Sequence, residues 1–458
     1  MLLASCGTVG RSSLCNASNY GAVADGVTDD TAAIQHAVDA CASQGGGTVE
    51  LAKGNANAGN VYISGPIVLK SHVYLLVDAG VTLQSTSDHS RFVPAFINWV
   101  YQPNEALISA KGATDVGIVG EGTIDGAADV PDPKDGGRTW HDIAETESAT
   151  NVSARPWVLE FYQCDHVTIS GVTLQNQPTW MQALRYSSNV VESGVTISGV
   201  GRNSDGVDVV GSTNVELSDL VINDSDDNIA IKSGLPIRTS DYYYAKEIGL
   251  PQMPTFNVLV KNITASEGQG LSIGSEAVNG VHDVAIENIN FTNIWYGFRI
   301  KSGRDRGGNI YNIHVKNFTM DGVDWAIAID PFYSATGPGI NGPAEPVTPT
   351  TPHIHDIDIQ NMVSTHTEVQ SFIHGLPEAC VFNITLKGVS IQTRALGLDL
   401  VHMTGTFNDV TSTPPAGDPP FEVEENVTVS SQGTTPALPV TVPYVGQIAC
   451  SSQAYPPS

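Results

Sequence analysis

The chain has few basic residues and no long apolar run. Lysine and arginine together number 21 against 48 aspartates and glutamates in 458 residues, which gives a formal net charge of −27. Binding to nucleic acid requires a basic surface, so this charge argues against a nucleic-acid partner. No segment approaches the roughly 18 consecutive apolar residues that a membrane-spanning helix needs. A polyanionic ligand would have to bind at a local basic patch.

One such patch is present in the sequence. Arg299, Lys301, Arg304 and Arg306 lie close together in a chain that is otherwise poor in basic side chains. Arg299 and Lys301 are separated by one residue, so they point to the same side of a strand and together suit a carboxylate ligand. A solvated turn is the alternative interpretation of these four cations.

Cysteine is also scarce, with six residues in the chain. Cys15 with Cys41 and Cys380 with Cys450 are candidate disulfides in an exported protein, although the sequence does not fix the connectivity. The sequence LASCG around Cys6 resembles the cleavage box of a bacterial lipoprotein, but no charged and apolar regions precede it. We therefore expect a secreted or periplasmic protein, or an envelope protein anchored by lipid at Cys6 if that match is not chance.

Polar residues followed by alternating apolar residues recur along the chain. Such units begin at Asp165, Asn189, Asn214, Asn257, Asp283, Asn312, Asp356 and Asn383. Their starts are 24 to 29 residues apart, except for two intervals of 43 and 44 that contain extra loops at 235–256 and 334–352. Period-2 alternation marks half-buried strands, and a repeat of this size indicates a solenoid. The sequence therefore predicts one elongated all-β domain.

Helical periodicity is convincing in one segment, 29–41. Acids lie at its start and apolar residues recur three and four positions apart. This helix would cap the open N-terminal end of the solenoid. The expected division of the chain is a leader or lipoprotein-like remnant at 1–18, the solenoid at 19–411, and a tail at 412–458 that packs on the solenoid.

Carboxylates are crowded into two short stretches. These are NSDGVD, which contains Asp205, and DDNIAIKSG, which contains Asp226 and Asp227. Counted from the start of each unit, Asp205 and Arg299 lie at +16, Asp227 at +13 and Gln269 at +12. Similar offsets place these residues on one wall of the solenoid. Crowded carboxylates raise one another's pKa, so that one stays protonated while another is ionised. Surface aspartates at turn ends are the alternative.

Four ordered motifs, NSDGVD, DDNIAIKSG, GQG at 268–270 and RIK at 299–301, resemble the signatures of glycoside hydrolase family 28. Their order and spacing are similar to those of the polygalacturonases. The resemblance implies a single-stranded, right-handed parallel β-helix. It also implies an inverting hydrolase of the α-1,4-galacturonosidic bonds in pectin or polygalacturonate, acting on this acidic plant cell-wall polysaccharide as a monomer, with neither metal nor cofactor.

The resemblance also implies roles for individual residues. Asp226 takes the general-acid position, while Asp205 and Asp227 take the positions that hold and activate water. Adjacent residues of a regular strand face opposite sides, so a bend or bulge must bring Asp226 and Asp227 into one cleft. The implied substrate-binding residues are Asn203, Gln269, Arg299, Lys301 and Tyr333.

Some of these roles have alternatives. Asn203 is expected to hold Asp205 or a sugar hydroxyl. For Tyr333 a packing role is equally expected, and Trp180 is either the floor of the cleft or a core residue. Asp208 is expected to be structural.

Two residues depart from the family pattern. Gln269 stands where the family has a histidine, and Asn228 where it has a cysteine. Glutamine can form hydrogen bonds but cannot titrate. Activity on homogalacturonan would then be low, or the substrate would be rhamnogalacturonan or xylogalacturonan. A polysaccharide lyase and a non-catalytic binding solenoid, such as an adhesin, are the remaining alternatives.

Overall fold

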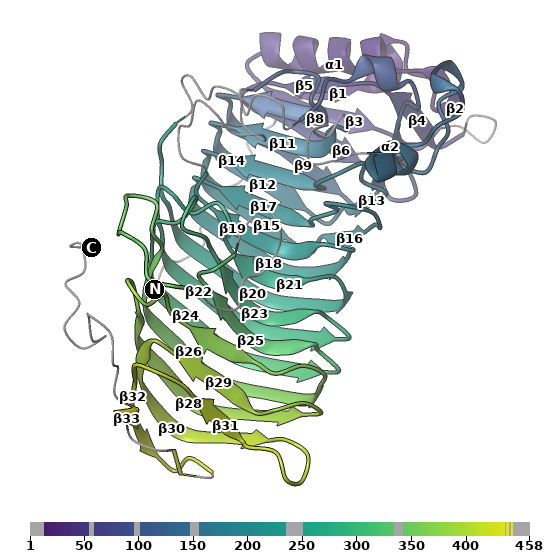
Figure 1. The fold of residues 1–458 in the computed structure, drawn as a ribbon. Helices are drawn as coiled ribbons and strands as arrows, with labels where there is room; N and C mark the ends of the chain where they lie inside the picture. Colours follow the sequence, from purple (N-terminus) through teal and green to yellow (C-terminus); the bar gives the residue numbers. More distant parts are fainter. Residues whose placement is uncertain are drawn as a thin grey trace.

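The chain is a parallel β-helix, and this confirms the predicted solenoid (Figure 1). The computed structural model describes residues 13–54, 59–95, 101–146, 155–234, 251–333, 342–435, 437–438 and 441–442. Successive coils stack along one axis, and the strands of neighbouring coils pair in parallel, as in β17 with β19 and β19 with β21. Among the strand pairs of the described residues, one is antiparallel, between β32 and β33.

One strand of each coil belongs to a 12-stranded sheet. In order from the N-terminal end, its strands are β5 (Ile67–Leu69), β8 (Ala106–Lys111), β11 (Trp157–Tyr162), β14 (Gln182–Arg185), β17 (Val207–Val210), β19 (Asp227–Lys232), β21 (Gly270–Ile273), β23 (Tyr296–Lys301), β25 (Trp325–Asp330), β27 (Phe372–His374), β29 (Leu398–Val401) and β31 (Phe421–Val423). The strands pair in register, so that residues of neighbouring coils line up in columns. Asp208 pairs with Ala230, Ala230 with Ser272, and Ser272 with Arg299.

The other strands form a 21-stranded sheet on the remaining faces of the coils. They are β1 (Ser13–Asn16), β2 (Asp25–Asp29), β3 (Gly47–Leu51), β4 (Val61–Ser64), β6 (Val73–Val77), β7 (Thr82–Ser85), β9 (Thr114–Gly120), β10 (Thr123–Asp125), β12 (Asp165–Ser170), β13 (Thr173–Gln175), β15 (Ser188–Ser193), β16 (Thr196–Ser198), β18 (Thr213–Asn223), β20 (Thr255–Glu267), β22 (Val281–Thr292), β24 (Asn309–Asp321), β26 (His353–Thr367), β28 (Val381–Thr393), β30 (Met403–Thr413), β32 (Val427–Gln432) and β33 (Thr441–Val442). Isoleucine, valine and leucine from both sheets fill the space between them and form one continuous core.

The polar residue that opens each unit has a conformational role. Seven of the eight predicted starts, from Asn189 to Asn383, adopt a positive φ of 54 to 56°, which short polar side chains tolerate. Their amides bond from coil to coil, as Asn257 Nδ2 donates to Asn214 Oδ1 at 2.7 Å. The start at Asp165 was wrong by one residue. Val167 pairs with Val190, so His166, with a φ of 55°, is the residue equivalent to Asn189.

The predicted capping helix is present as α1 (Thr31–Ser43) and covers the N-terminal end of the coils (Figure 1). It begins two residues later than expected. Asp30 accepts hydrogen bonds from the backbone N–H groups of Val23 and Ala24, at 2.7 and 3.1 Å, and so belongs to the loop before the helix. The 3-10 helices η1 (Ala17–Tyr20), η2 (His89–Arg91) and η3 (Pro133–Asp135) and a second α-helix, α2 (Trp140–Thr146), were not predicted. α2 has seven residues, which is too short for a periodic signal.

The capping helix is joined to the first coil by a disulfide between Cys15 and Cys41, as predicted. Cys380 is also disulfide-bonded, but Cys450 lies outside the described residues, so that pairing stays a prediction. Cys6 lies outside them as well. None of the described helices has the length and apolar character to cross a membrane.

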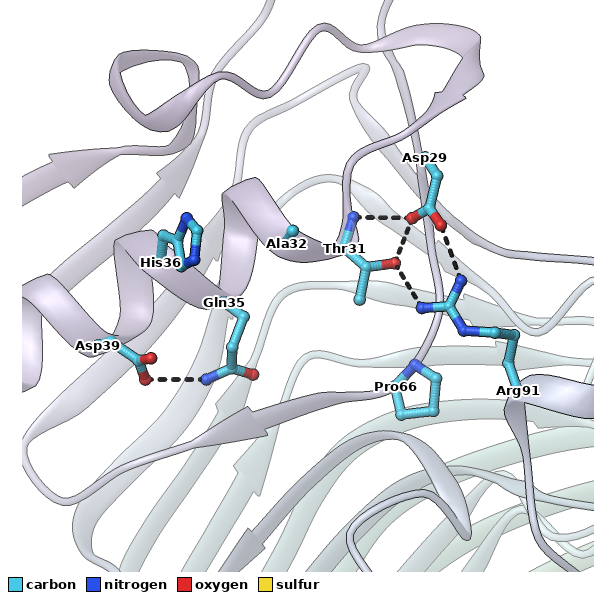
Figure 2. A pocket seen from close by; sticks show the side chains of 8 residues that line it. All are labelled: Asp29, Thr31, Ala32, Gln35, His36, Asp39, Pro66 and Arg91. Atoms are coloured by element: carbon cyan, nitrogen blue, oxygen red, sulfur yellow. Dashed lines mark hydrogen bonds and ion pairs between the residues drawn. The ribbon is translucent and has the colours of Figure 1, made fainter.

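A pocket lies beside α1 and η2 (Figure 2). Its charged groups bind one another, because Arg91 pairs with Asp29 at 2.7 Å and Asp39 pairs with Lys70 at 2.7 Å. Arg91 also lies beside Thr31, the first residue of the helix. The pocket is on the capped end of the molecule, whereas the acidic motifs lie further along the 12-stranded sheet.

The carboxyl group of Glu192 lies inside the coils. Glu192 on β15 is on the same side of its strand as Val190, which is a core residue, and it is fully buried. Among the described residues its hydrogen-bond donor is Gln182, whose Nε2 lies 2.7 Å from Oε1. Burial outweighs this bond and raises the pKa of Glu192 to about 7. The protonated form is therefore the one that fits the core.

This carboxyl group makes stability depend on pH. The folded protein keeps the proton of Glu192 while the unfolded chain releases it, so the stabilisation is full below pH 4.5 and is lost as pH rises through about 7. We expect a loss of roughly 3 kcal/mol in the free energy of unfolding over this range. Glu192→Gln should remove this part of the slope in urea titrations at pH 5 and pH 8.

The matched control is Glu216→Gln, which changes a partly exposed glutamate on β18 that pairs with Lys261. It should leave the slope as it is. A difference between Glu192→Gln and the unchanged protein that is the same at both pH values would contradict the assignment of a buried neutral acid.

Candidate active site

The two acidic motifs meet where β17 and β19 begin. Gly206 N donates to the carbonyl of Asp227 at 3.0 Å, which fixes the coil of the first motif beside that of the second. One carboxylate oxygen from each of Asp205, Asp226 and Asp227 lies within 4.8 Å of the others. Asp205 and Asp227 are buried and Asp226 is partly exposed. The three acids singled out from the sequence thus form one cluster.

The irregularity expected at the paired acids is present. Asp227 pairs with Gly270 and Ile229 with Leu271, so Asn228 is an extra residue in β19. Such a bulge changes the direction of the side chains on either side of it. It accounts for two consecutive aspartates that face the same cluster.

Asn228 holds this bulge in place. Its Nδ2 donates to the carbonyls of Glu267 at 2.8 Å and Ile222 at 3.3 Å, and to Asp224 Oδ1 at 2.9 Å. Its Oδ1 accepts from the N–H of Gly270 at 2.8 Å. A cysteine at this position has neither the donors nor the reach for these bonds. Asp224 was missed in the sequence; burial, with the charges of the neighbouring acids, raises its pKa well above the ordinary value.

The pKa values of the neighbouring acids Asp226 and Asp227 are shifted in opposite directions. Burial raises the pKa of Asp226, and the charge of Asp227 adds to the effect. Burial alone would raise the pKa of Asp227 too, but Lys301 and Lys232 outweigh it and hold the pKa below its ordinary value. Asp226 therefore keeps its proton at a pH at which Asp227 is ionised. Burial has the largest effect in raising the pKa of Asp205, and the charges of Asp208 and Asp226 add to it.

The basic pair of β23 lies beside the cluster. Lys301 Nζ is 2.5 Å from Asp227 Oδ2. The Arg299 guanidinium lies over the ring of Tyr296, at 3.9 Å from its centre, and 5.3 Å from the ring centre of Tyr333. Arg299 Nε has no hydrogen-bond partner among the described residues. Among the described residues, Lys301 is thus paired with Asp227, whereas the Arg299 guanidinium packs against two tyrosine rings.

The wider basic patch predicted from the sequence is not a patch of free cations. Arg304 pairs with Glu378 at 2.6 Å and with Glu345 at 3.2 Å. Arg306 pairs with Asp305 at 2.9 Å. The partners Glu345 and Glu378 come from distant parts of the chain, so the residues around Arg304 do not reveal them.

Two expected substrate-binding residues, Gln269 and Asn203, form hydrogen bonds to other residues of the chain. Gln269 N donates to the carbonyl of Asp226 at 2.6 Å, which places its half-buried side chain in the next coil along. Asn203 was expected to hold Asp205 or a sugar hydroxyl, but its Oδ1 accepts from Arg155 Nη2 at 3.3 Å. A φ of 56° at Asn203 turns the chain just before Asp205.

Sequence reasoning also missed Lys232, a charged residue of the cluster. Its Nζ lies 2.6 Å from Asp208 Oδ1, 3.5 Å from Asp205 Oδ2 and 3.9 Å from Glu276 Oε2. The ammonium group also lies over the ring of Trp180, at 4.0 Å from its centre. Lys232 belongs to the motif DDNIAIKSG, and a buried cation beside acids is the signal that would have identified it.

The spacing of the three acids is also one that a metal ion could occupy. Lys232 and Lys301 already supply two positive charges to the same carboxylates. We assign the compensating charge of the cluster to these lysines.

Comparison with known proteins identifies the family. The model of glycosyl hydrolases family 28 matches residues 41–406. The chain belongs to this family. It is therefore a glycoside hydrolase, as the four motifs indicated, and the lyase and adhesin alternatives are not favoured.

Relatives of this family 28 chain are described as polygalacturonases. An endo-polygalacturonase of Pectobacterium carotovorum subsp. carotovorum is 30% identical over 311 residues, which are 66% of this chain and 72% of the relative. A probable polygalacturonase of Vitis vinifera is 27% identical over 418 residues, 86% of this chain and 78% of the relative.

Solved structures have the same fold. A polygalacturonase from Erwinia carotovora ssp. carotovora has a TM-score of 0.69 at 26% identity, over 83% of this chain and 93% of that one. An exopolygalacturonase from Thermotoga maritima has a TM-score of 0.70 at 21% identity, over 95% of this chain and 93% of that one. At that lower identity the likeness concerns the fold alone.

The bonds of Asn228 lead to a stability prediction for this family 28 chain. Asn228→Ala removes four hydrogen bonds and leaves buried carbonyls and Asp224 without their donor. We expect a loss of about 2–4 kcal/mol in the free energy of unfolding, measured by denaturant titration. Asn228→Cys should lose nearly as much. Gln392→Ala on the exposed face of β28 is the control, with a change below about 0.5 kcal/mol. A small loss at Asn228 would mean that other groups hold the bulge.

Proposed function

We propose that this chain hydrolyses the α-1,4-galacturonosidic bonds of polygalacturonate in pectin. The observation that carries the proposal is the contact of Asp227 with Lys301 beside Asp226, whose pKa burial raises, with the Arg299 guanidinium on the same strand as Lys301. Hydrolysis of a glycosidic bond needs one carboxylic acid and one carboxylate. Arg299 suits a substrate that carries a carboxylate on each sugar. The relatives named polygalacturonases support the same substrate.

In the proposed mechanism Asp226 is the general acid. It is the partly exposed member of the cluster and retains its proton, so it can protonate the leaving oxygen of a bound chain. Asp227, ionised by its contact with Lys301, accepts a proton from the attacking water. Asp205 lies beside Asp227 and positions the same water.

Inversion at the anomeric carbon is the stereochemistry that the family resemblance implies. The separation of the carboxylates does not itself require it, since their nearest oxygens lie within 4.8 Å. In most inverting enzymes the two carboxyl groups are about 6.5–9.5 Å apart. The anomer formed first, observed by NMR during the reaction, decides the point.

For substrate binding we propose that Arg299, with Lys301, binds the galacturonate carboxylate on the leaving-group side of the scissile bond. Tyr333, half-buried and near both cations, would then contact the same sugar. Gln269 is half-buried and its backbone N–H donates to the carbonyl of Asp226, which supports our proposal that its side chain bonds to the substrate. We propose that Asn203 contributes its amide nitrogen to substrate binding, since its Oδ1 accepts from Arg155 Nη2.

We also propose that the protein is exported and acts as a monomer. The Cys15–Cys41 disulfide is typical of an oxidising compartment. The net charge of −27 makes copies of the chain repel one another. Lipid attachment at Cys6 remains a prediction that mass spectrometry of the protein from its host would test.

Replacement of the acid tests the function directly. Asp226→Asn keeps the shape but cannot donate the proton, so we expect turnover of polygalacturonate to fall by at least roughly 10²-fold with little change in stability. Asp219→Asn, an exposed aspartate of the coil ladder, is the control and should retain full turnover. Near-normal turnover by Asp226→Asn would remove this residue from the acid role.

Products are measured in the same experiment. A hydrolase generates new reducing ends without ultraviolet absorbance, whereas a lyase product absorbs because it carries a new double bond. A binding protein gives neither signal. Comparison of polygalacturonate with rhamnogalacturonan and xylogalacturonan identifies the preferred polymer.

Gln269→His tests the departure from the family pattern. If homogalacturonan is the substrate, an imidazole beside Asp226 should raise turnover on polygalacturonate and add an ionisation to the pH profile. A site adapted to another pectic polymer should lose activity on that polymer and gain none on polygalacturonate.

Arg299→Ala in parallel should raise KM for acidic oligosaccharides by about tenfold or more. An unchanged KM would contradict the carboxylate-binding role.

A further inference from the structure

Lys232 is a buried lysine at the centre of the candidate site. It ends β19, and its side chain is about 5% exposed. Val210 is its partner in β17, yet its ammonium group reaches back along the sheet to Asp208 at 2.6 Å and Asp205 at 3.5 Å. A buried cation is costly unless it is paired, so these acids and Lys232 stabilise one another.

Among the described residues, Lys232 is the one side chain that donates a hydrogen bond to the Asp205 carboxylate. The ring of Trp180 lies 4.0 Å below the ammonium group and keeps water from that side. Asp208 itself is fully buried and comes from the same column of the sheet as Arg299. The lysine thus bridges an acid of the proposed mechanism and an acid that is outside it.

Several other charged groups face this bridge. Asp226 and Asp227 lie on the side of β19. Glu276 follows β21; its Oε2 lies 3.9 Å from Lys232 Nζ, and Arg306 lies near it. From β23, Lys301 and Arg299 project toward the same cluster. Burial lowers the pKa of Lys232, but Asp208, Asp205 and Glu276 outweigh it, so Lys232 stays protonated. Burial raises the pKa of Asp208 to about 7 against the pull of Lys232.

We propose that Lys232 is a positioning residue that holds the Asp205 carboxylate toward the attacking water and divides its charge between Asp205 and Asp208. The inference rests on the proposed function, in which Asp205 positions that water. One ammonium group cannot compensate two carboxylates fully, and Asp208, at the shorter distance, takes the larger share. Asp208 then controls how strongly the lysine acts on the proposed catalytic acids.

Two substitutions should therefore move the pH profile in opposite directions. Lys232→Met removes the cation, which raises the pKa of Asp205, Asp226 and Asp227 together, so the optimum of kcat/KM should rise by about one pH unit. Asp208→Asn frees the cation to act on the same acids and removes a competing charge, so the optimum should fall by about half a pH unit. In Lys232→Met we expect kcat to fall about tenfold or more, with KM within about twofold.

Lys261→Met, at a lysine of β20 that pairs with Glu216, is the control and should leave the optimum unchanged. Thermal midpoints measured on all variants separate loss of fold from loss of position. If Lys232→Met does not fold, Asp208→Asn alone decides the matter. A folded, active Asp208→Asn with an unmoved or raised optimum overturns the proposal, as does a folded Lys232→Met with an unmoved one. An unchanged protein that is inactive on polygalacturonate would instead refute the proposed function.

Discussion

The coil-to-coil register of the 12-stranded sheet is the constraint on which the site depends. Neighbouring strands of a sheet lie about 4.8 Å apart, so motifs that are far apart in the sequence become neighbours only if each coil pairs without slipping. A slip by one residue would turn every side chain of a strand to the opposite face. On the 21-stranded sheet, asparagines with positive φ have amides bonded from coil to coil, and these bonds help to fix how the same coils stack. Near the acids, the described strands of the 12-stranded sheet depart from this register at the bulge of Asn228.

Within that frame the site is organised by the placement of few cations among many acids. Lys301 approaches Asp227 from one coil and Lys232 approaches Asp205 and Asp208 from another. Burial makes each of these charges act strongly on its neighbours, because little water screens them. A chain with a large overall excess of acid can in this way keep one carboxyl protonated and the adjacent one ionised. In the same arrangement Arg299 stacks on Tyr296, and it is the cation for which we propose the binding of a substrate carboxylate.

The sequence was sufficient to predict the architecture because strand alternation and repeat length are visible in short segments of the chain. It also located the acidic cluster, since unit offsets translate into columns of a solenoid. The error at Asp165 arose because an aspartate and the histidine after it both suit a turn, and only the pairing of Val167 with Val190 distinguishes them. Arg304 was misjudged for a different reason, namely that its partners Glu345 and Glu378 are brought to it by other coils. Lys232 was not predicted because a strand pattern does not show which outward-facing side chains are buried by neighbouring residues.

The two ends of the coil stack also have a consequence for association between copies. A solenoid that ended in a bare parallel strand would offer its backbone amides and carbonyls to the first strand of another molecule, and filaments would result. Here α1 lies across the first coils, and at the other end β33 crosses β32 in the antiparallel sense. A strand of reversed direction cannot serve as the next rung of a parallel stack. At both ends, therefore, the chain itself occupies part of the edge that a strand from another copy would need.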